Sequence, residues 1–267
     1  MLRIAVTFWL AAFILHGQSR DWQVVFAAHR GGIVEGVPEN TLAAFREAAR
    51  HGMRLIEIDL RATSDGAIVI LHDETLDRTT NGKGRLSDLT FAEIRKLDAG
   101  AGESIPSYAE VLAFARDSGV KLLLDIKEGP GLDKRRVVRM TEQAGMILDV
   151  IVGARSLGDL REFQGLNPNV RTLGFIRSPG EIDAFVEAGA GIIRLWPDWT
   201  DQDPGLIARV HRLGRPVWVT TGDAQRPKVE ALIDAGVNGI LGDRPALLRA
   251  IELERLKPEF QLNPLRP

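Results

Sequence analysis

Short apolar runs alternate with amphipathic stretches along most of the chain. The runs are continuous and rich in β-branched residues, as in strands that are buried on both faces of a parallel sheet. They predict strands at 24–28, 55–60, 121–127, 149–154, 170–176, 191–196, 216–221 and 239–241. Helical periodicity lies between them, in segments such as 41–52, 107–119, 181–190, 203–214 and 228–237. Each of these segments ends in glycine or close to one, which helix C-caps favour.

Eight strand–helix units in a chain of 267 residues agree in number and length with an α/β fold of the (β/α)8 TIM-barrel type. A doubly wound open sheet is the alternative that the same pattern allows. One interval departs from the repeat, because an additional apolar run (67–73), a polar tract and a short helical pattern follow the second strand. We expect a small insertion on the barrel rim, at about residues 74–105, that is too short to bury a core of its own.

The first nineteen residues differ in character from the rest of the chain. A short basic start at Arg3 precedes an apolar segment (4–15), and small residues follow at Gly17 and Ser19. This layout is typical of a secretory signal peptide, and its apolar segment is too short for a stable membrane span. We therefore expect cleavage after Ser19, a barrel domain over 20–267, and export to the periplasm or out of the cell. The alternative is an uncleaved interfacial helix or membrane tether.

Composition narrows the choice of partners and of stabilising forces. The chain is 45% hydrophobic with a formal net charge of −2, which gives no reason to expect a nucleic acid as its partner. It contains no cysteine, so no disulfide would stabilise an exported domain. Stability must therefore come from the hydrophobic core.

Chemically active side chains gather where the predicted strands end, which is where barrels of this type place their active sites. They are His29 and Arg30 after the first strand, Glu57 and Asp59 in the second, His72 and Asp73 at the end of the additional run, and Asp125 and Lys127 in the third. Residues two apart on a strand share one face, so Glu57 and Asp59 point to the same side while Ile56 and Ile58 face the helices.

Three carboxylates meet at this predicted mouth: Glu57, Asp59 and Asp125. They would repel one another strongly without a cation among them. Carboxylate oxygens are hard ligands that suit Mg²⁺ or Ca²⁺ better than zinc. The sequence therefore predicts a site for one divalent cation.

Several motifs together resemble the glycerophosphodiester phosphodiesterases, which are metal-dependent (β/α)8 barrels. These motifs are HRGG (29–32), PENT (38–41), EIDLRATSDG (57–66), LHD (71–73) and LDIK (124–127). The similarity continues through 77–100 and 105–112, where it resembles the inserted segment of that family, and ends with GVNGILGDRP (236–245). It spans almost all of the expected mature chain, and the combination is far more specific than HRG alone.

The resemblance implies a role for each of these residues. His29 and His72 would be the acid–base pair, Arg30 and Lys127 would hold the nonbridging phosphate oxygens, and Glu57, Asp59 and Asp125 would bind the metal. The implied reaction is hydrolysis of a small-molecule glycerophosphodiester to sn-glycerol 3-phosphate and an alcohol. The first strand would then end in HRGG because an acid–base group, a phosphate clamp and a flexible turn are needed there. Asp125 departs from the family, which more often has glutamate at this position.

Other interpretations of single residues stay open. Asn40 or Thr41 is equally well explained as the cap of the following helix, and Glu39 as a negative charge that favours the positive N-terminal end of that helix. Asp73 is expected to support a turn or a neighbouring site residue rather than to bind metal. The tryptophans at 196, 199 and 218 are candidates for the pocket rim, although core packing is the stronger expectation for each.

Two other functions are compatible with the same motifs. A related phospholipase or lyase would act on an intact lipid phosphodiester and form a cyclic phosphate. A non-catalytic barrel would bind phosphodiesters without cleaving them, which the presence of both histidines and all three carboxylates disfavours.

Overall fold

The computed structural model describes residues 22–256. The predicted signal peptide (1–19) lies outside the described residues. Within the described part of the chain, no helix is both long enough and apolar enough to cross a membrane.

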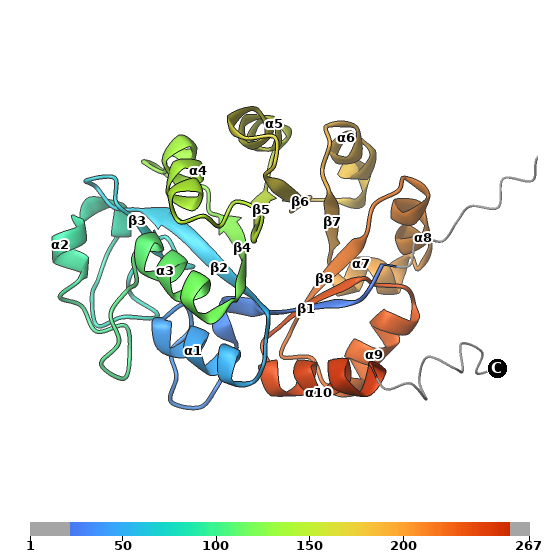
Figure 1. The fold of residues 1–267 in the computed structure, drawn as a ribbon, viewed down its shortest axis with the longest axis horizontal. Helices are drawn as coiled ribbons and strands as arrows, with labels where there is room; N and C mark the ends of the chain where they lie inside the picture. Colours follow the sequence, from blue (N-terminus) through green and yellow to red (C-terminus); the bar gives the residue numbers. More distant parts are fainter. Residues whose placement is uncertain (1–21, 257–267) are drawn as a thin grey trace, which may run out of the picture.

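A closed barrel of parallel strands forms the centre of the molecule (Figure 1). Its strands are β1 (Val25–Ala28), β2 (Leu55–Ala62), β4 (Lys121–Ile126), β5 (Val150–Ala154), β6 (Arg171–Gly174), β7 (Ile192–Leu195), β8 (Val217–Gly222) and β9 (Gly239–Gly242). β1 pairs with β9 on one side and with β2 on the other, which closes the ring. The barrel prediction is therefore confirmed, and the open sheet is excluded.

Helices surround this barrel on the outside (Figure 1). They are α1 (Leu42–Arg50), α3 (Tyr108–Ser118), α4 (Lys134–Gln143), α5 (Leu157–Leu166), α6 (Ile182–Glu187), α7 (Pro197–Gln202), α8 (Gly205–Arg212), α9 (Arg226–Asp234) and α10 (Pro245–Arg255). Local sequence sets their ends. In α3, for example, Ser107 and Glu110 form a capping box, and Gly119 ends the helix with a φ of 69°.

Alternation along each strand separates two layers of core. Ile56, Ile58 and Leu60 of β2 pack in the layer between barrel and helices, as predicted. The opposite strand faces fill the barrel interior with Ala27, Leu55, Leu123, Ile151, Leu173, Phe175, Ile192, Trp218 and Leu241. Because apolar side chains close the interior below, the polar side chains of Glu57 and Asp59 lie toward its carboxyl-terminal mouth.

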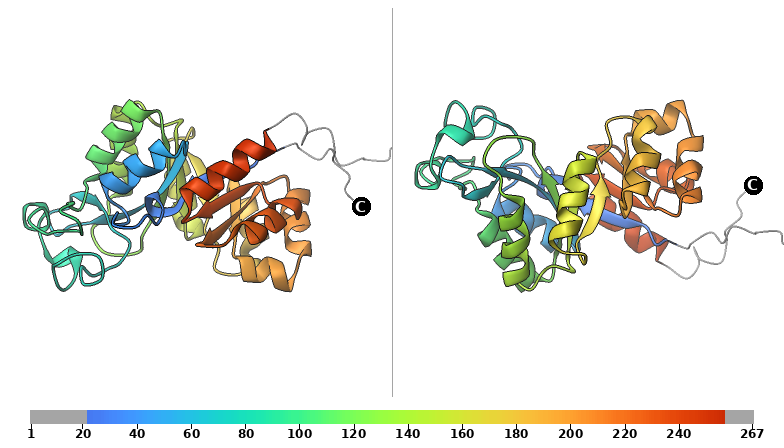
Figure 2. Two further views of the ribbon diagram at one scale, coloured as in Figure 1. Left: turned by 90° about the horizontal axis from the view of Figure 1, so that it is seen from below. Right: turned by 90° about the horizontal axis from the view of Figure 1, so that it is seen from above.

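The insertion after β2 projects from one end of the molecule (Figure 2). β3 (Ile68–Ile70) pairs antiparallel with the end of β2, and a 3₁₀ turn, η2 (Leu86–Asp88), and α2 (Phe91–Ile94) follow. The expectation that this segment buries no core of its own is wrong. A separate cluster holds Val69, Leu71, Leu76, Leu86, Ile94, Ala99 and Ile105. These buried apolar contacts fix the loop that carries His72.

Candidate active site

Close packing around its two glycines fixes the conformation of the HRGG turn. The residues after β1 form one 3₁₀ turn, η1 (His29–Gly31), and both glycines have a positive φ, 85° at Gly31 and 92° at Gly32. A Cβ at Gly31 would lie 2.7 Å from the Cβ of Ala44, and one at Gly32 would lie 2.5 Å from Cδ of Pro245. The expected flexible turn is therefore a tight one, which places the preceding histidine at the mouth.

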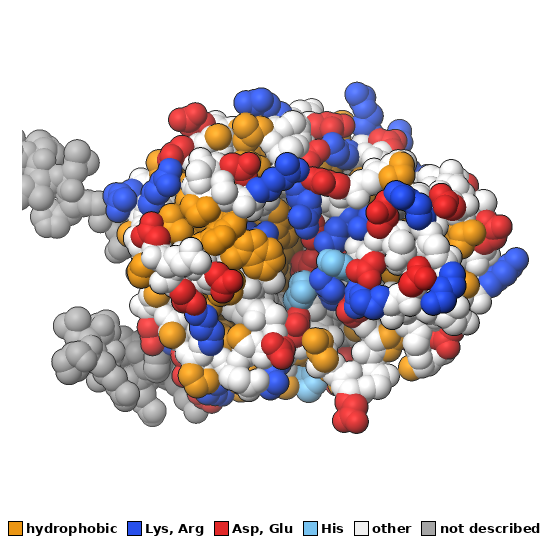
Figure 3. Space-filling model, turned by 180° about the vertical axis from the view of Figure 1, so that it is seen from behind, with side chains coloured by type: hydrophobic (Ala, Val, Ile, Leu, Met, Phe, Trp, Pro, Cys, Tyr) orange, Lys and Arg blue, Asp and Glu red, His pale blue; other side chains and the backbone are white. Residues whose placement is uncertain are grey.

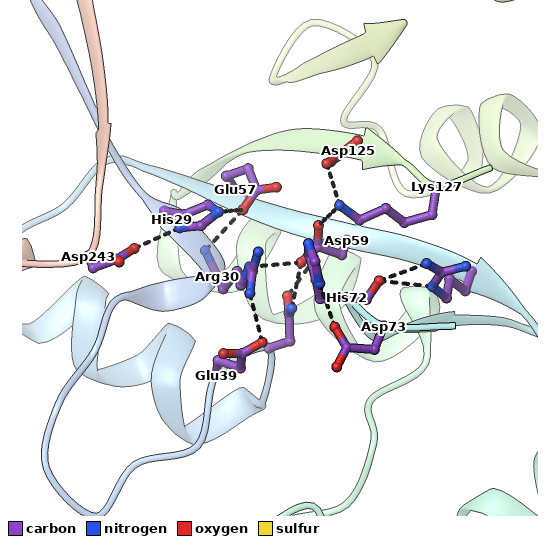
Figure 4. A network of polar contacts seen from close by, with 12 residues as sticks. His29, Arg30, Glu39, Glu57, Asp59, His72, Asp73, Asp125, Lys127 and Asp243 are labelled. Carbon is purple, nitrogen blue, oxygen red and sulfur yellow. Dashed lines mark hydrogen bonds and ion pairs between the residues drawn. The ribbon is translucent and has the colours of Figure 1, made fainter. Parts of the chain in front are cut away.

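His29 is held between two carboxylates (Figure 4). Its Nδ1 lies 2.6 Å from Oδ1 of Asp243, and its Nε2 lies 3.9 Å from Oε2 of Glu57. Burial lowers the pKa of His29, but the nearby Glu57 and the hydrogen bond to Asp243 outweigh it, so the pKa is raised. Asp243 follows β9 and was not among the predicted site residues. Its place at the end of a predicted barrel strand was the available signal.

The three predicted metal ligands lie together and are buried. One oxygen from each of Glu57, Asp59 and Asp125 can be chosen so that all lie within 4.8 Å of one another. Burial and the neighbouring Asp59 raise the pKa of Glu57. Oδ1 of Asp59 is buried and accepts no well-aligned hydrogen bond. A buried oxygen cluster in which Glu57 ionises with difficulty fits a divalent cation, which would stabilise the charged form of that carboxyl.

Two cationic side chains bind Asp125. Nζ of Lys127 lies 2.6 Å from its Oδ2 and 2.8 Å from Oδ1 of Asp59. Arg155, which follows β5, donates to both oxygens of Asp125, over 3.0 and 2.6 Å. Burial raises the pKa of Asp125, but these two cations outweigh it and lower the pKa. Three N–H donors already bind this carboxylate, so about one of its lone pairs remains for a further ligand. Arg155 was not predicted.

The PENT segment supports the site and caps a helix at the same time. Glu39 accepts a hydrogen bond of 3.0 Å from Nη1 of Arg30, and Asn40 donates one of 2.7 Å to Oδ2 of Asp59. Only Thr41 serves as the N-cap of α1, with its hydroxyl accepting from the helix backbone. The capping interpretation is therefore right for Thr41 and wrong for Asn40.

His72 is oriented by a second aspartate. Its Nδ1 lies 2.7 Å from Oδ1 of Asp73, and Arg78 donates to Oδ2 of Asp73 over 2.6 Å. Arg78 also binds Glu39, which joins this loop to the PENT segment. Burial lowers the pKa of His72 and outweighs the opposing effect of Asp73. Asp73 thus supports a neighbouring side chain, as expected, and Nε2 of His72 has no hydrogen-bond partner within residues 22–256.

All seven predicted site residues converge on one region (Figure 4). Figure 3 shows histidine side chains in a hollow, with basic side chains beside them and a group of hydrophobic side chains across the hollow. Of the three candidate rim tryptophans, Trp196 is 42% exposed, whereas Trp218 fills the barrel interior and Trp199 packs against the outer core. The rim interpretation therefore holds for Trp196 alone.

Comparison with known proteins identifies the family. Residues 29–247 match the glycerophosphoryl diester phosphodiesterase family. A glycerophosphodiester phosphodiesterase of Caldanaerobacter subterraneus is 34% identical over 233 residues, which cover 83% of this chain and 94% of the relative. A probable glycerophosphodiester phosphodiesterase 2 of Mycobacterium tuberculosis is 30% identical over 260 residues, 91% and 94% of the two chains.

Solved structures agree with this assignment. A crystal structure of a glycerophosphodiester phosphodiesterase from Agrobacterium tumefaciens matches with a TM-score of 0.74 and 29% identity, covering 85% of this chain and all of that one. The family match over residues 29–247 begins directly after β1 and includes the other seven barrel strands and both histidine-bearing segments. The chain belongs to the glycerophosphoryl diester phosphodiesterase family of enzymes.

Proposed function

We propose that this protein hydrolyses glycerophosphodiesters to sn-glycerol 3-phosphate and a free alcohol. The observation that carries the proposal is the pair of aspartate-bound histidines, His29 and His72, at the mouth that also holds three buried carboxylates. Metal-assisted hydrolysis of a phosphodiester uses two groups that transfer protons and a cluster of carboxylates that binds a metal cation. Membership of the family supports the same reaction.

Glu57, Asp59 and Asp125 would hold one divalent cation, Mg²⁺ or Ca²⁺. When bound, this ion would polarise the phosphoryl group and lower the pKa of a bound water or hydroxyl. Asp125 would contribute least, because Lys127 and Arg155 already occupy most of its acceptor directions.

Arg30 and Lys127 would bind the nonbridging phosphate oxygens. Nη2 of Arg30 has no hydrogen-bond partner among the described residues. Lys127 donates a hydrogen bond to Asp125 and forms an ion pair with Asp59, which leaves at least one of its three ammonium donors for a ligand. Both side chains are held by carboxylates, so little side-chain entropy is lost when an anion binds.

The two histidines would divide the proton transfers. His72 would take the proton of the attacking water, because its environment favours the neutral ring. His29, with Asp243 on Nδ1, would give the proton on Nε2 to the oxygen of the leaving alcohol. The bond from phosphorus to the water oxygen forms, and the bond from phosphorus to the leaving oxygen breaks.

The test is product release from glycerophosphoethanolamine by the 20–267 fragment, with Mg²⁺, Ca²⁺ or EDTA. We expect glycerol 3-phosphate and ethanolamine in equal amounts, loss of turnover with EDTA, and loss in His29→Ala. His51→Ala is the matched control, because His51 lies at the end of α1 and contacts Glu47. A cyclic glycerol phosphate as the final product would favour the lyase alternative, and binding without turnover would favour the non-catalytic one.

We also propose that the protein is exported, on the basis of the pattern in residues 1–19. Fractionation of expressing cells and N-terminal sequencing of the product test this. A mature chain that begins at Arg20 outside the cytoplasm would support export. An intact N-terminus on membranes would favour the tether.

A further inference from the structure

A buried arginine on the barrel wall has no polar partner. Arg194 lies on β7 between Ile193 and Leu195, which face the helices, so its side chain points into the barrel mouth. It is 4% exposed, and its Nε and Nη1 are buried without a hydrogen-bond partner. Within residues 22–256 its contacts of note are aromatic: its Cζ lies 3.8 Å from the ring centroid of Trp196 and 5.1 Å from that of Phe175.

Such a side chain is unfavourable for folding. Burial, reinforced by the positive charge of Arg155, lowers the pKa of Arg194 to about 10, and only the negative charge of Asp125 acts in the other direction. Buried cations are normally paired and hydrogen-bonded, because an unpaired one loses its hydration without compensation. Contacts with aromatic rings return only part of that loss. The barrel itself therefore gives no reason for an arginine here, whereas an anionic ligand would.

A second guanidinium lies beside the first. Cζ of Arg155 lies 5.2 Å from the centroid of Phe175, the same ring that Arg194 contacts. The two arginines come from the ends of β5 and β7, on either side of β6. In the ring of eight strands β7 stands opposite β2, which carries Glu57 and Asp59. Arg194 thus lies across the mouth from Glu57 and Asp59, and Arg155, which also binds Asp125, lies between the two walls.

We propose that Arg194 and Arg155 form an anion-binding subsite for a second negative charge on the substrate, a carboxylate or phosphate carried by the leaving alcohol. This inference rests on the proposed function. The scissile phosphate would lie against Arg30 and Lys127, so an anion at Arg194 belongs to a different part of the molecule. The half-exposed ring of Trp196 beside Arg194 would cover the bound group and exclude water. The enzyme would therefore prefer anionic headgroups to choline or ethanolamine.

Two substrates that differ by one carboxylate test the subsite. Glycerophosphoserine and glycerophosphoethanolamine share the phosphodiester and the ammonium group, and only the first carries a carboxylate. We expect kcat/KM to favour glycerophosphoserine by roughly tenfold or more, as one buried charge-assisted hydrogen bond would give. In Arg194→Met this ratio should fall to near one. Arg161→Met, an exposed position on α5, is the matched control and should keep the wild-type ratio.

Two further measurements distinguish a failure of the subsite proposal from a failure of the proposed hydrolysis. Calorimetry on EDTA-treated protein compares the affinities for glycerophosphoserine and glycerophosphoethanolamine without turnover. Tighter binding of glycerophosphoserine would support the subsite even if no hydrolysis is observed. The melting temperature of Arg194→Met should equal or exceed that of the wild type, because an unpaired buried charge is removed. Equal binding and equal kcat/KM for the two substrates in the wild type would overturn the proposal. An equal decrease of kcat/KM for both substrates in Arg194→Met would also overturn the proposal, because Arg194 would then act on the phosphodiester that the two substrates share.

Discussion

His29 and His72 have the same local arrangement, since each places Nδ1 against an aspartate, yet their pKa values are shifted in opposite directions. The difference comes from the surroundings. Burial is the largest effect on both rings and lowers both pKa values. Glu57 and Asp243 together outweigh it at His29, whereas Asp73 and Asp59 do not outweigh it at His72. Two similar imidazoles can in this way serve as acid and as base in the same pH range.

Asp243→Asn tests whether the orientation of His29 matters. An amide in place of the carboxylate no longer stabilises the imidazolium and offers a donor where Nδ1–H needs an acceptor. We expect kcat to fall by roughly a hundredfold or more, by analogy with other aspartate–histidine pairs. Asp223→Asn, at an exposed position after β8, is the control. Activity of Asp243→Asn within twofold of the wild type would show that the 2.6 Å contact plays no part in turnover.

The pH profile tests the environment of His72. If this ring accepts a proton, kcat/KM falls as the pH drops through its pKa, which lies below the ordinary histidine value of 6.5. The hydrogen bond to Asp73 raises that pKa, so its removal in Asp73→Asn should lower it further. The acidic limb of the profile should then move to lower pH. A limb that stays in place or moves to higher pH contradicts the assignment of His72 as the base.

Sequence patterns located the residues that act along one strand better than those that act between strands. The spacing of two in EIDL put Glu57 and Asp59 on one face correctly, because alternation depends only on local geometry, and the rule that strand ends meet at the mouth added Asp125. Asp243 and Arg155 were missed because their partners lie on other strands. Arg194 carried a signal that was not used: a charged residue within an apolar strand, on the same face as Ile192 of the barrel interior.

At the scale of elements, the eight predicted strands are all present, with ends that differ from the prediction by at most two residues. Continuous β-branched runs are a strong signal because both strand faces are buried. The short pieces were harder to predict, since α2 and α7 contain only a few residues and depend on packing. The core of the insertion was missed because its apolar residues are spread over 69–105 and meet only after folding.

Gly239→Ala tests how tightly the barrel interior is packed. A Cβ at Gly239 of β9 would lie 2.4 Å from atoms of the Trp218 ring, which is buried inside the barrel. Overpacking of this kind costs about 1–3 kcal/mol, which would lower the melting temperature of a domain of this size by roughly 2–12 °C. Gly165→Ala in α5 is the control, since no atom lies within 4 Å of its Cβ and alanine favours helix. Equal melting temperatures for the two variants would contradict the packing described here.

At the scale of the whole molecule, the barrel brings residues from distant parts of the chain to one mouth. His29 and Asp243 are 214 positions apart in sequence, yet they are hydrogen-bonded because β1 and β9 are neighbours at the closure of the ring. The two ends of the mouth differ in chemistry, with three carboxylates and two histidines at one end and Arg194 with the aromatic rings of Phe175 and Trp196 at the other. With the proposed subsite, this asymmetry would give a bound phosphodiester a defined direction.

The central claim is that one divalent cation, held by Glu57, Asp59 and Asp125, enables hydrolysis. The most direct measurement is turnover of glycerophosphoethanolamine by metal-free protein as Mg²⁺ or Ca²⁺ is added, with binding followed by calorimetry in parallel. We predict that turnover rises from background in proportion to the occupancy of one ion per chain, and that Glu57→Gln loses both binding and turnover. Full turnover by the metal-free protein, or metal binding that leaves turnover unchanged, would contradict the account.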